Sequence, residues 1–249
     1  MKVTIITVTF NSEKHLDQSI NSVLSQDYGN IEYLVVDGQS TDGTLDIIKK
    51  YENRISKWVS EPDKGMFDAL NKAMDMATGD IIGVLHSDDV FAGEGVVSAV
   101  VKAFKENKVD AVYGDLNYVF AEDISKIYRN WKGRIFHRSL FHKGWMPAHP
   151  AFYFKKQLIE KYGNYRIEYK SAADYELMTR YLYKNRVPAI YIPELMILMR
   201  RGGMSNSNLQ KRLKANRNDY LAMKANGIPM PLLVSIMKPL SKLHQYYKK

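Results

Sequence analysis

The sequence predicts an α/β fold in which a mainly parallel, Rossmann-like sheet carries helices on both faces. Short β-branched runs alternate with amphipathic helical stretches over roughly the first ninety residues, which is the pattern of βαβ units. Polar and acidic side chains follow successive strands at the point where each strand ends. Ligands of such sheets gather at the carboxyl ends of the strands. We therefore expect a ligand site along one rim of the sheet.

The predicted elements follow one another at short intervals. The strand-like runs are 3–10, 31–37, 55–60, a short apolar run within 79–89, and 111–114. The helical stretches are 16–24, 45–48, 67–77 and 96–104. The chain from Tyr118 to Phe154 is aromatic and irregular, and a further helix begins near Ser171. Strand character returns from Pro188 to Met199, where Pro193 indicates an edge strand or a break.

Length and composition indicate a globular protein. A chain of 249 residues can bury a sizeable core, and we expect a first subdomain over 1–115, a second over 116–205 and a helical tail over 206–249. With no cysteine, disulfides and thiolate metal sites are excluded, which is consistent with the cytoplasm. The basic and then apolar start is interpreted as a strand rather than a signal peptide, and no apolar run reaches transmembrane length.

The net charge of +9 lies in the tail. Residues 201–249 contain ten Lys or Arg and one acid, so residues 1–200 balance to zero. This distribution argues against a nucleic-acid-binding main domain and indicates a tail that meets an anionic partner. The helical stretches 208–225 and 232–243 are either an interfacial membrane attachment or a segment docked on the body, and both interpretations stay open.

Two adjacent carboxylates, Asp88 and Asp89, end the stretch 79–89, whose short apolar run is interpreted as a buried strand. Neighbouring carboxylates repel each other, and a divalent cation that also binds phosphate oxygens removes that penalty. The alternative is an ordinary turn or helix cap, where Asp is also favoured. The chain has neither the glycine-rich dinucleotide fingerprint after its first strand nor a Walker lysine loop, which disfavours a dehydrogenase and an ATPase.

Three further features carry alternative interpretations. Asp174, with Glu176 in the same first helical turn, is either a general base or a charge favoured by the helix dipole. The turn 200–205, Arg-Arg-Gly-Gly-Met-Ser, either holds a diphosphate or is a solvated loop. Trp131 and Trp145 are either platforms for sugar rings or ordinary core aromatics.

Six motifs, in order, resemble those of family-2 glycosyltransferases with the GT-A fold, over roughly residues 3–205. They are Thr7-Val8-Thr9-Phe10-Asn11, Val35-Val36-Asp37-Gly38-Gln39-Ser40-Thr41-Asp42-Gly43-Thr44, Glu61-Pro62-Asp63-Lys64-Gly65, Ala69-Leu70-Asn71-Lys72-Ala73, Ser87-Asp88-Asp89 and Ala173-Asp174-Tyr175-Glu176. The resemblance implies a nucleotide-diphosphate sugar donor, a bound Mn²⁺ or Mg²⁺, and inversion at the anomeric carbon.

Roles for individual residues follow from this resemblance alone. For the donor it implies Thr9, Phe10, Asn11 and Asp37 at the nucleotide, Asp63 and Lys64 beside the base, and Asp88 at the ribose or donor sugar, with Asn71 as a further binding residue. It implies Asp89 as the metal ligand and Asp174 as the catalytic base. The sequence departs from the family pattern at His86, where many relatives have an acid or Asn, and at Ala173, which replaces the Glu of a common Glu-Asp pair.

The resemblance therefore implies an inverting transferase that moves a sugar to an acceptor hydroxyl in cell-surface polysaccharide assembly. The expected acceptor is a saccharide or a lipid-linked molecule, met at the inner face of the membrane through the tail, and nucleic acid is not an expected partner. Two other functions stay open: an inactive nucleotide-sugar-binding protein, and a nucleotidyltransferase on a similar sheet.

Overall fold

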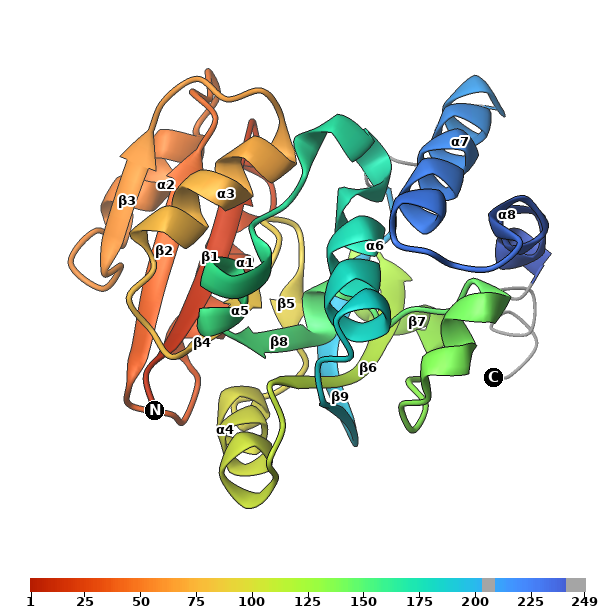
Figure 1. Cartoon of the computed structure of the whole chain (residues 1–249). Coiled ribbons are helices and arrows are strands. Elements are labelled where there is room, and N and C mark those ends of the chain that lie inside the picture. Colours follow the sequence, from red (N-terminus) through yellow and green to blue (C-terminus); the bar gives the residue numbers. More distant parts are fainter. Residues whose placement is uncertain (203–208, 241–249) are drawn as a thin grey trace.

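The computed structural model describes the backbone of residues 1–202 and 209–240, and the side chains of 1–202 and 214–238. Its core is a single twisted sheet in the order β3-β2-β1-β4-β8-β6-β9-β5, with β7 paired to β6 (Figure 1). The strands are β1 Val3–Thr9, β2 Ile31–Asp37, β3 Lys57–Ser60, β4 Ile81–Val84, β5 Val90–Phe91, β6 Ala111–Phe120, β7 Asp123–Trp131, β8 Phe152–Lys155 and β9 Ala189–Arg200.

Helices cover both faces of this sheet. They are α1 Leu16–Leu24, α2 Thr44–Lys50, α3 Met66–Met76, α4 Val96–Glu106, α5 Gln157–Tyr162, α6 Ala173–Met178, α7 Leu209–Ala225 and α8 Pro231–Leu240. Short 3₁₀ turns are η1 Arg138–Lys143, η2 His149–Ala151 and η3 Ile167–Ala172, and a π-helical turn, η4 Thr179–Lys184, continues α6. No helix among the described residues is long and apolar enough to cross a bilayer.

The first half of the sheet is parallel, as predicted. β1 pairs in parallel with β2 and β4, and β2 pairs in parallel with β3. Right-handed crossovers toward β3 place α1 and α2 on one face, and the return crossover to β4 places α3 on the other (Figure 1). Because both faces are covered, all seven residues of β1 are buried.

The second half of the sheet is mixed, which the sequence did not predict. β8 is antiparallel to β4 and β6, and β7 is antiparallel to β6, so the aromatic stretch interpreted as irregular contains two strands. β9 lies inside the sheet between β6 and β5. Pro193 is tolerated there because it falls in a register shift, between the pairs Tyr113↔Tyr191 and Asp115↔Leu195.

The expected subdomains share this sheet. β6 runs across the predicted division at residue 115, and the side chains of both halves belong to one hydrophobic core. The division into 1–115 and 116–205 stays a prediction. What the fold supplies for a site is the rim at the carboxyl ends of β1, β2, β3 and β4.

Gly83 tests how tightly this core is filled. A Cβ at this position would lie 2.3 Å from Cε1 of Tyr153, a buried ring of β8. We expect Gly83→Ala to lower the free energy of unfolding by about 1–3 kcal/mol, since overpacking forces the ring and backbone to move. Gly93→Ala is the matched control, because a Cβ there meets nothing within 4 Å. Urea unfolding measures both, and an unchanged midpoint for Gly83→Ala would contradict this account.

Candidate functional site

Two predicted nucleotide residues, Thr9 and Asp37, end neighbouring strands directly opposite each other. The carboxylate of Asp37 is fully buried and accepts hydrogen bonds from the backbone N–H of Ser40 at 2.9 Å and the hydroxyl of Ser60 at 2.6 Å. Ser40 Oγ also donates to Asp37, at 2.5 Å. Asp37 therefore shapes the rim by tying the turn after β2 to the end of β3.

Asn11 joins the turns after β1 and β2. Its backbone is in the left-handed region, with φ 48°, its N–H donates to Ser40 Oγ at 2.8 Å, and its side-chain oxygen accepts from the Thr41 N–H at 2.9 Å. Asn tolerates this conformation better than most residues. The ring of Phe10, held between these turns, is 60% exposed and free to cover a flat ligand.

Asp63 approaches the same place from the loop after β3. A Cβ on Gly38 would lie 2.5 Å from Asp63 Oδ2 and 3.4 Å from the Phe10 ring, so only glycine admits this contact. The other oxygen of Asp63 accepts from the Gly65 N–H at 2.7 Å. Lys64 is exposed beside it. The structure thus brings Phe10, Asp63 and Lys64 together at one end of the rim.

The turn after β4 carries the two adjacent acids in different environments. Asp88 is half-buried, whereas Asp89 is fully buried. The backbone N–H of Arg200 donates to Asp89 Oδ1 at 3.1 Å, and Asp89 Oδ2 has no partner among the described residues. The Asp88 carboxylate is therefore the one that can meet a ligand without rearrangement, while Asp89 lies behind it.

Arg200 holds this turn in place. Its side chain is 4% exposed; Nη1 donates to the Asp88 carbonyl at 2.6 Å, and Nη2 donates to Gln18 Oε1 on α1. The predicted diphosphate loop therefore turns its first arginine inward. Arg201 is exposed, with its guanidinium 4.4 Å from the centre of the Tyr128 ring, and residues 203–205 of that loop lie outside the described residues.

Burial is the main influence on the charge of Asp89. Burial raises the pKa of this carboxyl well above its usual range, and the neighbouring Asp88 raises it further. The backbone N–H and the guanidinium of Arg200 lower the same pKa. Arg200 therefore makes it less unfavourable for this turn to carry two negative charges.

An aromatic cluster, in which His149 and Tyr165 are buried, lies beside the turn and was not predicted as part of the site. His149 Nε2 is 2.6 Å from the hydroxyl of Tyr165, the rings of His86 and His149 are 5.5 Å apart, and the Phe67 ring lies 5.2 Å from that of Tyr165. Burial, followed by the neighbouring His86, lowers the pKa of His149 to about 3, so this imidazole is neutral. The cluster joins the β4 tip to the segment that precedes α6.

Asn71 supports this cluster rather than facing the rim. Its side-chain amide donates to the Tyr165 carbonyl at 2.9 Å, and its oxygen accepts from the Tyr165 N–H at 3.0 Å. Both of its groups are occupied by one backbone segment. Asn71 thus fixes Tyr165 to α3, and its predicted role at the nucleotide stays a prediction.

The two acids at the start of α6 are also distinct. Asp174 is half-buried. The pKa of the Tyr165 hydroxyl is raised chiefly by the burial of Tyr165 itself, and next by the charge of Asp174. Glu176 is fully buried, 2.9 Å from Arg180 Nη2 and 3.2 Å from the amide nitrogen of Asn226, the residue that follows α7. Glu176 therefore anchors α6, and Asp174 is the carboxylate of this turn that lies toward the cluster.

Of the two interpretations of Trp131 and Trp145, the contacts of these rings favour core packing. Trp131 is buried and stacks on Tyr118, with ring planes 8° apart. Trp145 is half-buried and meets the rings of Tyr113 and Phe141 edge-on. The core interpretation of these rings accounts for their contacts.

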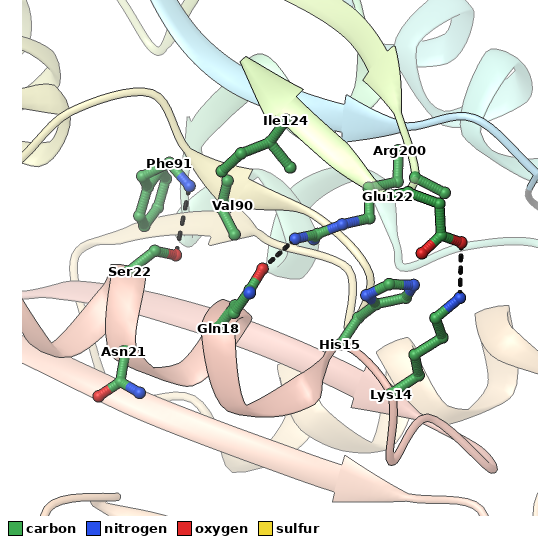
Figure 2. Close-up of a pocket in the computed structure, with 11 residues that line it drawn as sticks. Lys14, His15, Gln18, Asn21, Ser22, Val90, Phe91, Glu122, Ile124 and Arg200 are labelled. Carbon is green, nitrogen blue, oxygen red and sulfur yellow. Dashed lines mark hydrogen bonds and ion pairs between the residues drawn. The ribbon is translucent and has the colours of Figure 1, made fainter. Parts of the chain in front are cut away.

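A cavity of about 560 Å³ lies behind Arg200, between α1 and the hairpin of β6 and β7 (Figure 2). Figure 2 shows the Arg200 side chain reaching Gln18, and Lys14 paired with Glu122 at 2.8 Å. None of the residues predicted for donor, metal or base is among the described residues that line it. Arg200 thus separates this cavity from the Asp88 turn.

Sequence reasoning missed Arg200, His149 and Tyr165 as parts of the site. The residue pattern indicates Arg200 only as part of a loop that either holds a diphosphate or is solvated, and it gives no role to His149 or Tyr165. Their partners are distant in the sequence, since Arg200 and Gln18 are 182 positions apart. The only available signal was that β9 ends in Arg200 and that two adjacent acids follow β4 a few residues later.

The comparison with protein families decides the class. Residues 4–163 match the family model described as Glycosyl transferase family 2. The chain belongs to family 2 of the glycosyltransferases. An uncharacterized glycosyltransferase of Mycobacterium tuberculosis is 34% identical over 183 residues, which are 72% of this chain and 68% of the relative. A PGL/p-HBAD biosynthesis glycosyltransferase of Mycobacterium bovis is 27% identical over 214 residues, 84% of this glycosyltransferase and 80% of that protein.

Solved structures confirm the predicted GT-A fold. S. aureus TarS in complex with UDP-GlcNAc superposes with a TM-score of 0.72 at 22% identity, covering 90% of this glycosyltransferase and 66% of that chain. The mannosyltransferase PcManGT from Pyrobaculum calidifontis, in complex with GDP-Man and Mn²⁺, gives a TM-score of 0.68 at 19% identity, covering 98% and 70%. Family membership and fold agree that this protein is an enzyme of glycosyl transfer.

The role of Arg200 can be tested by removing its side chain. We expect Arg200→Leu to lower the free energy of unfolding by about 1–3 kcal/mol, because the Asp88 carbonyl and Gln18 lose their donor inside the protein. Arg201→Leu, an exposed neighbour, is the control and is expected to change stability by no more than about 0.5 kcal/mol. Urea unfolding gives both values. Equal midpoints for the two variants would contradict the role assigned to Arg200.

The loss in free energy of unfolding caused by Arg200→Leu should also grow with pH. A raised pKa in the folded state means that the unfolded chain releases the Asp89 proton first, so stability falls as the pH rises above about 3.9, through the raised pKa. Without the guanidinium this effect is larger, and the deficit is expected to be greater at pH 7 than at pH 4. Adding Asp89→Asn removes the titrating group, and a pH-dependent deficit that persisted in that double variant would place its origin elsewhere.

Proposed function

We propose that this glycosyltransferase moves a sugar from a nucleotide-diphosphate sugar to an acceptor hydroxyl, with inversion at the anomeric carbon. The observation that carries the proposal is the placement of two accessible carboxylates around one buried cluster. Asp88, at the β4 tip, lies on the side of His86, and Asp174 lies on the side of Tyr165. A donor between them would have its leaving group at one acid and its reacting carbon toward the other.

The rim of β1, β2 and β3 is proposed to hold the nucleotide. The exposed Phe10 ring offers an apolar face to the base, and Asp63 and Lys64 lie beside it. Asp37 and Asn11 keep the surrounding turns in place through Ser40 and Thr41. Thr9 Oγ1 is buried without a hydrogen-bond partner among the described residues, so it has capacity for a ligand at this point. The UDP and GDP complexes of the two solved neighbours support a nucleoside diphosphate here.

The residues at the β4 tip fit a divalent cation shared with the donor. No group of three or more His, Cys, Asp or Glu side chains poised for a metal occurs in the part of the chain that the structure describes. Such a group is not required, because Mg²⁺ is commonly held by one or two carboxylates together with substrate phosphates. Asp88 is the accessible carboxylate, and Asp89 adds negative charge behind it. When bound, Mn²⁺ or Mg²⁺ would stabilise the charge that develops on the departing diphosphate.

Asp174 is proposed as the general base. Its carboxylate would accept the proton of the acceptor hydroxyl while the acceptor oxygen bonds to the anomeric carbon. The bond from that carbon to the phosphate oxygen breaks in the same step, and the nucleoside diphosphate leaves with the electron pair. Single displacement of this kind inverts the anomeric configuration and needs no covalent intermediate. Glu176 is unsuited to this role because Arg180 and Asn226 occupy its oxygens.

The acceptor is proposed to be a saccharide or a lipid-linked molecule, used in cell-surface polysaccharide assembly at the cytoplasmic face of a membrane. The basic C-terminal region supports a contact with an anionic surface. An inactive nucleotide-sugar-binding protein would bind donor without releasing nucleoside diphosphate, and a nucleotidyltransferase would release pyrophosphate from a nucleoside triphosphate. The membership in family 2 favours glycosyl transfer over both.

The cation site can be assigned with two isosteric variants. We expect Asp88→Asn to abolish the increase in nucleoside diphosphate affinity that Mn²⁺ produces, since the accessible charge is lost. Asp89→Asn should retain most of that increase, because its carboxylate is buried behind the turn. Calorimetry of UDP and GDP binding, with and without Mn²⁺, measures the difference. The reverse result would instead support the sequence prediction that Asp89 ligates the metal.

The base can be tested by Asp174→Asn. We expect donor affinity to be unchanged and turnover to fall roughly 10²- to 10⁴-fold, which is the usual contribution of a positioned base. The reaction is followed as nucleoside diphosphate release from a panel of UDP- and GDP-sugars with Mn²⁺, screened with saccharide and lipid-linked acceptors. Asp75→Asn serves as a surface control. Asp75 is an exposed residue of α3 that accepts a hydrogen bond from the Asn164 amide at 3.2 Å. Wild-type turnover in Asp174→Asn would remove this residue from the mechanism.

A further inference from the structure

Among the side chains of α8 that the structure describes, those that attach the helix to the body lie on one side. Val234, Ser235 and Lys238 are buried, and Lys238 Nζ lies 2.8 Å from Asp219 Oδ1 on α7. The same ammonium is 3.6 Å from the centre of the Tyr175 ring, the residue after Asp174. The helix is thus fixed beside the start of α6, and the tail sequence is in part docked on the body.

The opposite side of α8 is apolar and exposed. It consists of Leu232, Leu233, Ile236 and Met237, preceded by Met230, whose exposed fractions run from 41% to 68%. Spacings of one, four and five positions place the four helical members on one side of the helix, away from Val234 and Lys238. We call these five residues the α8 apolar face. A group of large apolar side chains gathered in one place marks an interaction surface, whereas single exposed ones do not.

The two elements that pack against α8, η1 and α7, carry positive charge. α8 packs against η1, which belongs to a stretch, residues 124–159, with eight Lys or Arg and no Asp or Glu. Lys132, Arg138 and Lys143 of this stretch are exposed. The balance of charge over residues 1–200 therefore concealed a basic segment, which the fold places against the basic tail (Figure 1).

α7 adds to the same charge. Lys214, Arg217 and Lys224 are exposed on this helix, and its single acid, Asp219, is paired with Lys238. The apolar face is thus bordered by cations from two parts of the chain. A second copy of the protein would bring the same cations together, and like charges placed opposite one another disfavour an interface. A negatively charged, apolar surface complements both properties.

We propose that the α8 apolar face inserts into the head-group region of an anionic lipid bilayer, with the basic side chains of η1 and α7 against the lipid phosphates. Amphipathic helices bind membranes by this combination of buried apolar area and electrostatic attraction. The inference deepens the proposed function and rests on it. Lys238 of α8 contacts Tyr175, the residue after the proposed base Asp174, so the acceptor side would face the membrane. Its binding step does not depend on catalysis.

The experiment measures co-sedimentation of the full chain with vesicles of phosphatidylcholine alone or mixed with phosphatidylglycerol. We expect binding only to the anionic vesicles, weakened by added salt. Leu232→Glu combined with Ile236→Glu should reduce binding roughly tenfold or more, because two inserting side chains become charged. The matched control carries Ile127→Glu and Leu195→Glu, two exposed apolar positions on β7 and β9, and should bind like the wild type. Circular dichroism and thermal unfolding establish that both variants are folded.

Several outcomes would overturn the inference. These are no binding to anionic vesicles, equal binding to both vesicle types, and equal loss in the α8 and control variants. Light scattering could instead show that the wild type and the control variant are dimers and the α8 variant is a monomer. That result would assign the face to a second copy of the protein. Donor binding is measured by calorimetry on the same samples. A protein that binds vesicles without binding any nucleotide would contradict the proposed function while supporting this surface.

Discussion

The rim of the sheet depends on the way Arg200 joins three elements that are far apart in the sequence. Its backbone N–H contacts Asp89, one guanidinium nitrogen contacts the Asp88 carbonyl, and the other reaches Gln18 on α1. A turn that carries two adjacent acids is electrostatically unfavourable by itself. The buried arginine compensates for part of that cost and fixes the direction in which Asp88 faces. The end of β9 thereby shapes the ligand rim of the parallel half.

The second half of the molecule solves a similar problem at α6. Glu176 is a fully buried charge, and such a charge is tolerated only when hydrogen bonds and ion pairs satisfy it. Arg180 and Asn226 supply them, and Arg180 also donates to the carbonyls of Gly163 and Asn164. These contacts hold the segment that leads to Tyr165. The two buried charges thus position the two accessible ones, Asp88 and Asp174, without contacting a ligand themselves.

Local pattern predicted the parallel half of the fold well. Apolar, β-branched runs bounded by glycine or polar turns placed β1, β2 and β4, because strands buried on both faces need that composition. β7 was missed because only one of its residues is buried and its side chains show no regular alternation. The internal position of β9 was also missed, since a proline argues for an edge unless a register shift accommodates it.

The site was predicted in location more than in function. The strand-end acids are where the motifs indicated, yet the sequence could not show that Asp37 is saturated by Ser40 and Ser60 or that Asp89 is buried. Those facts depend on contacts between distant segments. The family resemblance supplied the class of reaction, which the comparisons confirm. It supplied no information about which acids are accessible in this chain.

The contact between Asn226 and Glu176 has a consequence for engineering. The C-terminal helices complete the polar surroundings of a buried carboxylate, so they are not a detachable appendage of the catalytic body. Shortening the protein before α7 to obtain a smaller crystallisation target would leave that charge with fewer donors. Chimeras between homologous enzymes should for the same reason exchange positions 176 and 226 as a unit.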